Sequence, residues 1–421
     1  MKQEELVVGL DLGSSKLIAM AARKNEHGVL SILDAQKMKT ENCIRRGCVH
    51  NIEDTTNKVK RLLTEFNKEG QAFDKIYVGI NGQSLHSHLH IVTREKGEEI
   101  VTQKLLDLLL EECRLFSPEK EGLDILDIVS LPEYILDGQV EKNPVGVRCS
   151  KIEARFQLIR GKLALKNDLK EIIEKEANMP IAGYFISPLA TAEAVLTEEQ
   201  KKLGCALVEL GGGVTTVSVY TNGFLRYLIT IPLGGDVITK DLQNMNVLEE
   251  EAETLKKDGY LDGLELDSEK IELIISTRSE EIIENVIEQI KESGYFNELN
   301  EGIFITGGSA SLNDLSEFLK EKTKLPVLLV SAKRSLVNQA SDLSGDPANS
   351  TVIGLLALGK GDCAVPQIEE EKPKAPGELF GEDEIGIKNG ENNRGKTEFR
   401  GGRSPRPNPF GGFIKRLFDD E

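Results

Sequence analysis

Two similar glycine-rich turns, one near the start of the chain and one near its middle, constrain the fold more than any other feature. They are Asp11–Lys16 and Glu209–Thr216, and each lies between two apolar segments that read as strands. Each turn begins with a carboxylate and continues with small residues, whose exposed backbone N–H groups can surround phosphate oxygens. We therefore expect two matching halves with a nucleotide between them. Two ordinary β-turns are the alternative, which the duplication disfavours.

The residue types in the turns predict how a magnesium nucleotide would be held. Asp11 and Glu209 would orient the hydrated cation, and they are the candidate catalytic residues. Lys16 can contact a terminal phosphate as a point charge, and Thr215 adds a hydroxyl to the second turn. The other residues expected to bind phosphate, through backbone N–H groups, are Gly13, Ser14, Ser15, Gly211, Gly212 and Gly213.

Composition indicates a soluble globular protein of more than one domain. The chain has 421 residues, of which 39% are hydrophobic, and a net charge of -18. This acidity argues against a general nucleic-acid binder, because phosphate backbones are held chiefly by clustered Lys and Arg. No apolar run approaches the ~20 residues that span a bilayer, and Glu4 and Glu5 argue against a signal peptide. We expect a cytoplasmic protein whose scattered cysteines are reduced thiols.

The segments 1–82 and 163–196 alternate strand and helix. Apolar residues at helical spacing predict a helix over 52–68, with Asp54 or Thr55 as its N-cap. The segment 163–196 reads as helix, strand and helix. Apolar runs predict strands over 6–11, 16–23, 29–39 and 75–80.

From 83 to 162 the pattern changes to short strands around one helix, 103–116, so we expect a small inserted α+β domain. His86, His88 and His90 alternate in sequence and would share one strand face, as metal ligands do. No nearby carboxylate or thiol pattern completes a metal site. An exposed strand is the simpler interpretation of the three histidines.

The second half begins at 197 and repeats the strand, turn, strand pattern. Asn222-Gly223 between two apolar runs predicts a β-hairpin. Apolar spacing predicts a helix from Thr239, a helix over 279–292 and a last helix over 351–359. The strongly acidic segment 249–301 fits either a well-solvated subdomain or a partner surface.

The end of the chain changes character twice. Residues 361–409 predict a disordered linker, because they have too few apolar side chains to offset the entropy of ordering. Apolar residues at helical spacing in 410–421 predict an amphipathic membrane-binding segment. A motif that docks into a protein groove is the alternative. The apolar residues are Phe410, Phe413, Ile414, Leu417 and Phe418, and Lys415 and Arg416 would lie at lipid headgroups.

These motifs together resemble the superfamily of actin, sugar kinases and heat-shock chaperone ATPases, and within it the FtsA family of bacterial cell-division proteins. The two glycine-rich turns are similar to the two phosphate loops of that superfamily. Residues 187–196 resemble the first connecting helix, and 303–312 resemble the adenosine loop. The insert lies where the FtsA family carries its own small domain, with similar turns at 132–138 and 143–148. The resemblance implies a duplicated, ribonuclease H-like α/β fold.

The resemblance also implies domain boundaries and nucleoside contacts. Subdomain 1A would comprise 1–82 and 163–196, the inserted 1C domain 83–162, and the second half 197–360, with subdomain 2B at about 241–301. The implied ligands are ATP and Mg²⁺. The further residues implied to contact the nucleotide are Gly235, Glu253, Lys256, Gly307, Gly308 and Ser309.

Membership of the FtsA family would imply a protein that binds ATP, polymerises and anchors FtsZ. Its place would be the cytoplasmic face of the inner membrane at the division septum. The implied partners are the FtsZ C-terminal tail, other copies of the chain, other divisome proteins and membrane lipids, and no nucleic acid. The acidic segment 249–301 is the candidate contact for FtsZ.

Two departures from the superfamily pattern predict slow or absent hydrolysis. Glu209 is one methylene longer than the usual Asp, which would displace the metal-bound water. Ser187 and Pro188 stand where strongly active relatives often place Gln or Glu to orient water. The alternatives are a pilus-assembly ATPase of the PilM type, and a sugar or metabolite kinase, for which no catalytic Asp near a sugar pocket is identified.

Overall fold

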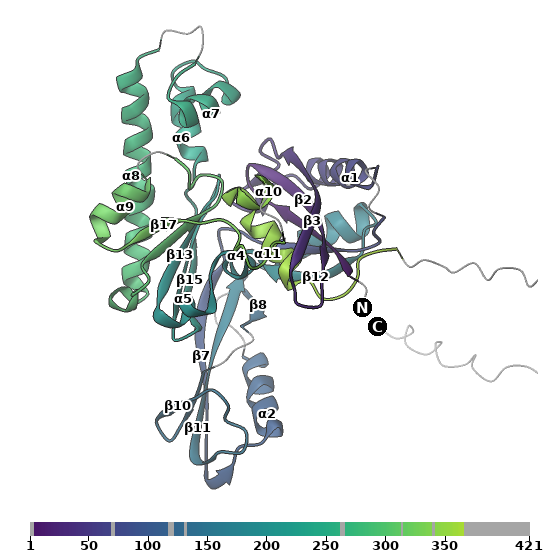
Figure 1. Ribbon diagram of the computed structural model, residues 1–421, viewed down its shortest axis with the longest axis vertical. Coiled ribbons are helices and arrows are strands. Elements are labelled where there is room, and N and C mark those ends of the chain that lie inside the picture. The colour runs from purple at the N-terminus through teal and green to yellow at the C-terminus, as the bar shows by residue number, and fades with distance from the viewer. Residues whose placement is uncertain are drawn as a thin grey trace, which may run out of the picture. The chain divides into compact units, whose positions relative to one another are not determined.

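The two halves are built on sheets with the same strand order, as the duplicated turns predict (Figure 1). The computed structural model describes residues 4–68, 72–116, 122–129, 133–261, 266–312, 315–338 and 342–365. The linker was predicted over 361–409, and from 366 onward it lies outside the described residues, whereas 361–365 are described and form hydrogen bonds with the first half. The predicted amphipathic segment also lies outside the described residues, with Phe410, Phe413, Ile414, Lys415, Arg416, Leu417 and Phe418.

The first sheet has five strands in the order β12 (Ile181–Ile186), β6 (Ile76–Ile80), β1 (Glu5–Leu12), β2 (Lys16–Lys24) and β3 (Leu30–Lys39). The central strand β1 is antiparallel to β2 and parallel to β6. Both β1 and β2 are buried over most of their length, which explains their nearly continuous apolar sequences. The first glycine-rich turn is the connection between these two strands.

The second half repeats this arrangement in the order β15 (Phe224–Ile231), β14 (Thr215–Thr221), β13 (Cys205–Leu210), β16 (Ile303–Thr306) and β17 (Val327–Leu329). Its central strand β13 is antiparallel to β14 and parallel to β16, as β1 is to β2 and β6. The predicted hairpin at Asn222-Gly223 is confirmed, with φ of 57° and 83° as a type I′ turn requires.

Two apolar helices, α4 (Ser187–Val195) and α11 (Ser350–Leu358), pack against each other next to both sheets. Gly354 of α11 faces the backbone of Ala190 in α4 so closely that a Cβ would overlap it. The helix predicted over 52–68 is α1 (Ile52–Lys68). Its N-cap is Asn51 rather than Asp54 or Thr55, because the Asn51 Oδ1 accepts from the Asp54 N–H at 3.0 Å.

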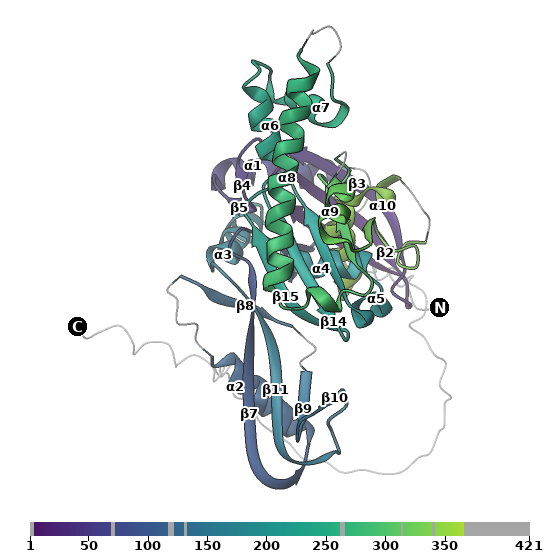
Figure 2. The ribbon, with the colours of Figure 1, turned by 90° about the vertical axis from the view of Figure 1, so that its left-hand side faces the viewer.

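The segment predicted as an inserted domain contains two long strands, so the expectation of short strands was wrong. These are β7 (His86–Ile100) and β11 (Arg148–Gly161), which pair along most of their length and bend at a bulge. In a long antiparallel ribbon of this kind, successive side chains point alternately to a covered face and to an open face. α2 (Gln103–Arg114) covers one face, where Phe156 and Leu158 are buried (Figure 2). The shorter strands are β8 (Asp124–Ile128), β9 (Glu133–Leu136) and β10 (Gln139–Glu141).

The ribbon joins the sheet of the second half. His86 at the start of β7 pairs with Ile229 of β15, so the strands of both form one sheet of ten strands. The Leu228 N–H also donates to the Ser87 Oγ at 2.8 Å. The inserted segment is therefore attached to the second half by backbone pairing as well as by the chain that leads into it.

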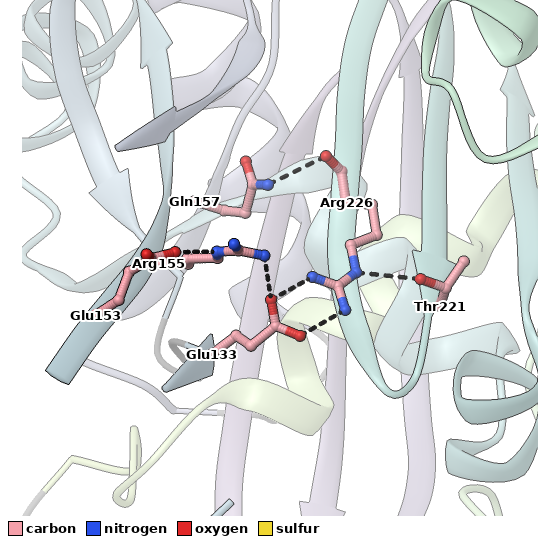
Figure 3. Close-up of polar contacts among 6 residues, drawn as sticks. All are labelled: Glu133, Glu153, Arg155, Gln157, Thr221 and Arg226. Carbon is pink, nitrogen blue, oxygen red and sulfur yellow. Dashed lines mark hydrogen bonds and ion pairs between the residues drawn. The ribbon is translucent and has the colours of Figure 1, made fainter. Parts of the chain in front are cut away.

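A buried polar cluster reinforces this attachment (Figure 3). Arg226 of β15 forms a bidentate pair with Glu133 of β9, at 2.8 and 2.9 Å. Arg155 of β11 lies 3.6 Å from the same carboxylate, and Gln157 donates to the Arg226 carbonyl at 3.1 Å. The side chains of Glu133 and Arg226 are only 7% and 11% exposed, so each charge depends on the other.

The second half carries a helical extension whose boundaries differ from the predicted ones. α6 (Asp236–Gln243) begins before Thr239, and α8 (Ser268–Glu292) begins well before 279. Asp267 caps α8 by accepting from the Lys270 N–H at 3.2 Å. Few side chains are buried in the first half of α8, so the apolar spacing in that part of the sequence is weak. α7 (Glu249–Asp258) lies between them in the chain.

The remaining described elements are short. They are β4 (Ile44–Arg45), β5 (Cys48–Val49), α3 (Ala164–Lys170) with a π-helical turn over Glu171–Glu176, α5 (Glu198–Leu203), α9 (Leu315–Thr323) and α10 (Asp342–Gly345), with 3₁₀ turns at Phe296–Glu298 and Pro347–Asn349. In the part of the chain that the structure describes, no helix is long and apolar enough to cross a membrane. All six cysteines are free thiols.

After α11 the chain returns to the first half. The Leu6 N–H donates to the Asp362 side chain at 3.0 Å, and the Cys363 N–H donates to the Leu6 carbonyl at 2.7 Å. The Asp74 N–H donates to the Cys363 carbonyl at 3.0 Å, and Phe73 pairs with Ala364. The end of the described chain is therefore fixed beside β1 and β6.

Candidate functional site

The two glycine-rich turns have the same backbone hydrogen bond. The Gly13 N–H donates to the Lys16 carbonyl at 3.0 Å, and the Gly211 N–H donates to the Val214 carbonyl at 2.9 Å. Each turn follows the central strand of its sheet and opens into the antiparallel neighbour. The duplication predicted from the sequence thus extends to the local geometry of the turns.

The turns lie against each other. A Cβ added at Gly213 would be 2.6 Å from the Ser14 Oγ, and one added at Gly212 would be 3.1 Å from the Ser15 Cβ. Ser14 is held in place because its Oγ accepts from the Gly47 N–H at 2.8 Å. Glycine is thus required at the second turn because the first turn occupies the space that side chains would need.

The carboxylates that begin the turns, Asp11 and Glu209, are both half-buried. Desolvation and the negative charge of Glu209, opposed by the positive charge of Lys16, together raise the pKa of Asp11 to about 7. Burial also raises the pKa of Glu209, against hydrogen bonds from Thr351 and Thr191. Two acids that share one buried site disfavour each other's ionisation unless a cation is added.

Polar atoms without a protein partner surround these carboxylates. Among the described residues, the Glu209 Oε2, the Ser187 Oγ and the Thr215 Oγ1 are buried and make no hydrogen bond. A Cβ added at Gly79 would contact the Ser187 Oγ and lie 3.4 Å from the Asp11 Oδ1, so these two oxygens flank one point. Carboxylate and hydroxyl oxygens are the donors that a hydrated Mg²⁺ takes, and the residues present fit that ion.

Lys16 lies among charges that suit a polyphosphate. Burial lowers its pKa, Lys37 and Lys257 lower it further, and Asp346 and Asp11 oppose this. Lys37 and Lys257 are thus close enough to repel Lys16, although Lys37 is paired with Asp346 at 3.2 Å. An anion with several negative charges would relieve this repulsion.

The outer side of the second turn is braced by two other loops. The N–H groups of Gly235 and Asp236 donate to the Gly211 and Gly212 carbonyls at 3.0 and 2.8 Å. The Ser309 Oγ donates to the Gly211 carbonyl at 3.1 Å. Gly307 has a φ of 99°, and a Cβ there would lie 2.5 Å from the Leu210 carbonyl oxygen. Gly235 and the 307–309 loop are thus brought to the second turn.

The two charged residues expected on a nucleoside, Glu253 and Lys256, lie together on α7. The Lys256 Nζ donates to the Glu253 Oε1 at 2.6 Å and to the Thr239 Oγ1 at 2.8 Å. It also lies 3.3 Å from the Gly235 carbonyl oxygen. α7 is therefore linked to the loop that braces the second turn.

Sequence reasoning missed three residues of this site, Thr191, Thr351 and Asp236. The Thr351 Oγ1 donates to the Glu209 Oε1 at 2.8 Å and lies 2.9 Å from the Thr191 Oγ1. Both threonines are buried in apolar helices, α4 and α11. A hydroxyl on the buried face of an apolar helix is the sequence signal that could have found them.

The three alternating histidines lie apart from this site, on β7. The rings of His88 and His90 stack on Phe116 at centroid distances of 5.7 and 4.2 Å. Burial lowers the pKa of both. Over the described residues, no group of three or more His, Cys, Asp or Glu side chains is placed to hold a metal ion.

Comparisons with known proteins agree on one family. The family model for the cell division protein FtsA matches residues 206–354. FtsA of Porphyromonas gingivalis is 32% identical over 337 residues, which cover 74% of this chain and 70% of that protein. FtsA of Neisseria meningitidis is 29% identical over 399 residues, which cover 87% of this chain and 94% of that protein.

Solved structures agree on the fold. The chain is similar to a PilM-PilN type IV pilus biogenesis complex with a TM-score of 0.60 and 14% identity, over 85% of this chain and 98% of that one. At this identity the likeness bears on the fold alone. The duplicated α/β fold expected from the sequence is confirmed.

Proposed function

Because the chain belongs to the FtsA family of cell division proteins, we propose that it is an ATP-binding, actin-like protein that polymerises and anchors the FtsZ ring at the inner membrane. The observation that carries the ATP site is the pair of glycine-rich turns that face each other, each beginning with a half-buried carboxylate whose pKa is raised. The backbone N–H groups of the turns would bind the phosphates. Asp11 and Glu209 would orient a hydrated Mg²⁺, which supplies positive charge to the phosphate oxygens.

Slow hydrolysis is part of the proposal. The Glu209 carboxylate is engaged with Thr351 through one oxygen, which would restrict the positions from which its other oxygen orients an attacking water. Ser187, at the start of α4, has too short a side chain to replace the Gln or Glu that orients water in active relatives. The nucleotide would then act as a switch for assembly, and the protein as a scaffold rather than a catalyst of metabolism.

The partner surfaces are proposed from charge and family membership. The acidic segment 249–301, which includes α7 and α8, is the candidate contact for the FtsZ C-terminal tail. Residues 410–421 are the candidate contact with membrane lipids at the cytoplasmic face of the division septum. Self-association would give avidity, because many weak membrane segments joined in one filament bind together. Other divisome proteins would be recruited to that filament.

Titration with a fluorescent ATP analogue tests the nucleotide site. The wild-type chain should bind the analogue with Mg²⁺. Gly213→Ala should weaken binding at least about tenfold, because its Cβ would lie 2.6 Å from the Ser14 Oγ and push the turns apart. Gly345→Ala is the matched control, since a Cβ added at Gly345 would meet no atom of the described residues within 4 Å. Equal affinity of the Gly213→Ala variant and the wild type would refute this site.

Co-sedimentation with liposomes tests the membrane contact. We expect the full chain to pellet with vesicles that contain anionic lipid, more strongly with ATP than without it. A truncation after Pro409 removes the amphipathic segment and should stay in the supernatant. Equal pelleting of the two forms would remove the membrane proposal and leave the nucleotide proposal standing.

A further inference from the structure

We propose that Thr351 and Thr191 are positioning residues that hold one oxygen of Glu209 and present the other to the cation. The Thr351 Oγ1 donates to the Glu209 Oε1 at 2.8 Å, whereas the Glu209 Oε2 is buried without a partner among the described residues. A carboxylate held at one oxygen cannot rotate freely. Its second oxygen then keeps one direction.

The hydroxyl of Thr191 fixes the orientation of Thr351. Their oxygens are 2.9 Å apart, and the Thr191 hydroxyl donates to the Ser187 carbonyl at 3.0 Å, so its one proton is shared between two acceptors. When Glu209 is ionised, Thr351 must donate to it, and the Thr351 oxygen can then only accept from Thr191. Thr191 therefore acts on Glu209 through Thr351 and also through its own hydroxyl, which lies near enough to lower the pKa of Glu209.

This arrangement depends on the close approach of α4 and α11. Thr191 lies on α4, which completes the first half, and Thr351 lies on α11, which completes the second. Gly354 lets the two helices approach because it has no Cβ to meet Ala190. The direction of the Glu209 carboxylate is therefore tied to the helix pair that joins the halves.

Glu209 has one methylene more than Asp, and this longer side chain carries its carboxylate to Thr351. Only the part of this inference that concerns Mg²⁺ rests on the proposed function.

The first experiment measures the Mg²⁺ dependence of nucleotide binding with the fluorescent ATP analogue, in Mg²⁺ and in EDTA. Thr351→Val should lose most of the affinity gain that Mg²⁺ provides, about tenfold, and bind as the wild type does in EDTA. Thr351→Ser should restore the gain, and Thr191→Val should lose a smaller part of it. The control is Thr323→Val, a buried helical threonine of α9 outside the site.

The second experiment needs no nucleotide. Thr351→Val, Glu209→Met and the double variant are compared by thermal unfolding of the metal-free full chain. We expect the two shifts in Tm to be non-additive by about 3 °C, because both changes remove the same hydrogen bond.

The outcomes separate this inference from the proposed function. If the wild type binds no nucleotide, the proposed function fails, and the unfolding experiment alone decides whether Thr351 positions Glu209. If Thr351→Val keeps the full Mg²⁺ gain, or loses affinity equally in Mg²⁺ and EDTA, the inference is wrong although the nucleotide site stands. Additive shifts in Tm would also overturn it.

Discussion

At the level of single residues, the place of the second turn's glycines in the candidate site could be predicted from sequence. The hydrogen-bond partners of Glu209 could not. Gly212 and Gly213 follow a strand and a carboxylate, and this local pattern requires nothing from the rest of the chain. Thr351 reaches Glu209 only through the packing of α11, which is far away in the sequence. Local spacing therefore identifies the atoms that would contact phosphate, whereas the atoms that orient the carboxylate depend on tertiary contacts.

Lys256 provides a prediction that separates nucleoside binding from phosphate binding. Lys256→Met removes the donor to Gly235 and leaves Glu253 with only the hydrogen bond from Thr239. We expect about tenfold weaker binding of the fluorescent ATP analogue, because hydrogen bonds from a charged group contribute about 1.5–3 kcal/mol. Inorganic tripolyphosphate should compete for the turns with unchanged affinity.

The control is Lys270→Met, since Lys270 is an exposed lysine of α8. It should leave both affinities unchanged. A parallel loss of affinity for the analogue and for tripolyphosphate would mean that Lys256 acts on the turns and not on the nucleoside.

At the level of elements, the strands of the first sheet were predicted more accurately than those of the inserted segment. β1 and β2 were found within a residue of their ends, because both faces are apolar. β7 misled the prediction because its histidines lie on the covered face, in register with buried Leu158 and Phe156, whereas Leu89 and Ile91 on the open face are 46% and 45% exposed. The usual link between alternating polarity and burial is reversed there.

Gly354 gives a prediction in which packing outweighs helix propensity. Ala is a better helix former than Gly by about 1 kcal/mol, so propensity alone would make Gly354→Ala stabilising. We expect the opposite, a loss of about 2–3 kcal/mol, because the new Cβ would overlap the Ala190 backbone and force α4 and α11 apart. Thermal unfolding measures the sign.

Gly345→Ala in α10 is the matched control, since its Cβ would meet no atom within 4 Å in the described part of the chain. Its Tm should stay the same or rise slightly. A Gly354→Ala variant with a raised Tm would show that α4 and α11 can separate without cost.

At the level of the whole molecule, the cluster around Glu133 links the inserted segment to the nucleotide site. Arg226 lies on β15, and the chain after β15 leads to Gly235 and Asp236, which brace the second turn. A buried ion pair adds little net stability, but breaking it leaves an unpaired charge. The position of the inserted segment is thus fixed relative to the loop that supports the turn.

Glu133→Gln tests this link and its pH dependence. Hydrogen bonds from Arg226 lower the pKa of Glu133 below its ordinary value of 4.5. A lowered pKa means that the pair stabilises the fold fully above that value and loses its effect as pH falls through the lowered pKa. At pH 7 we expect the variant to be less stable by about 3 kcal/mol locally, seen as faster hydrogen exchange in β9 and β11.

The difference between variant and wild type should shrink at pH 4. Glu153→Gln serves as the control, because Glu153 bonds Arg155 at 2.7 Å but is 21% exposed and should matter less. An equal effect of both variants would mean that burial of the Glu133 pair has no special role.

A mechanical force that pulls on the chain end would be transmitted to the first sheet through residues 362–365. Force applied beyond Val365 meets bonds to Leu6, Ala72 and Asp74 that lie side by side. Bonds loaded together in shear share the force, whereas bonds loaded one after another peel apart. Tension on the chain end would therefore strain the half that carries Asp11 and Lys16, and leave the half that carries Glu209 mechanically unloaded.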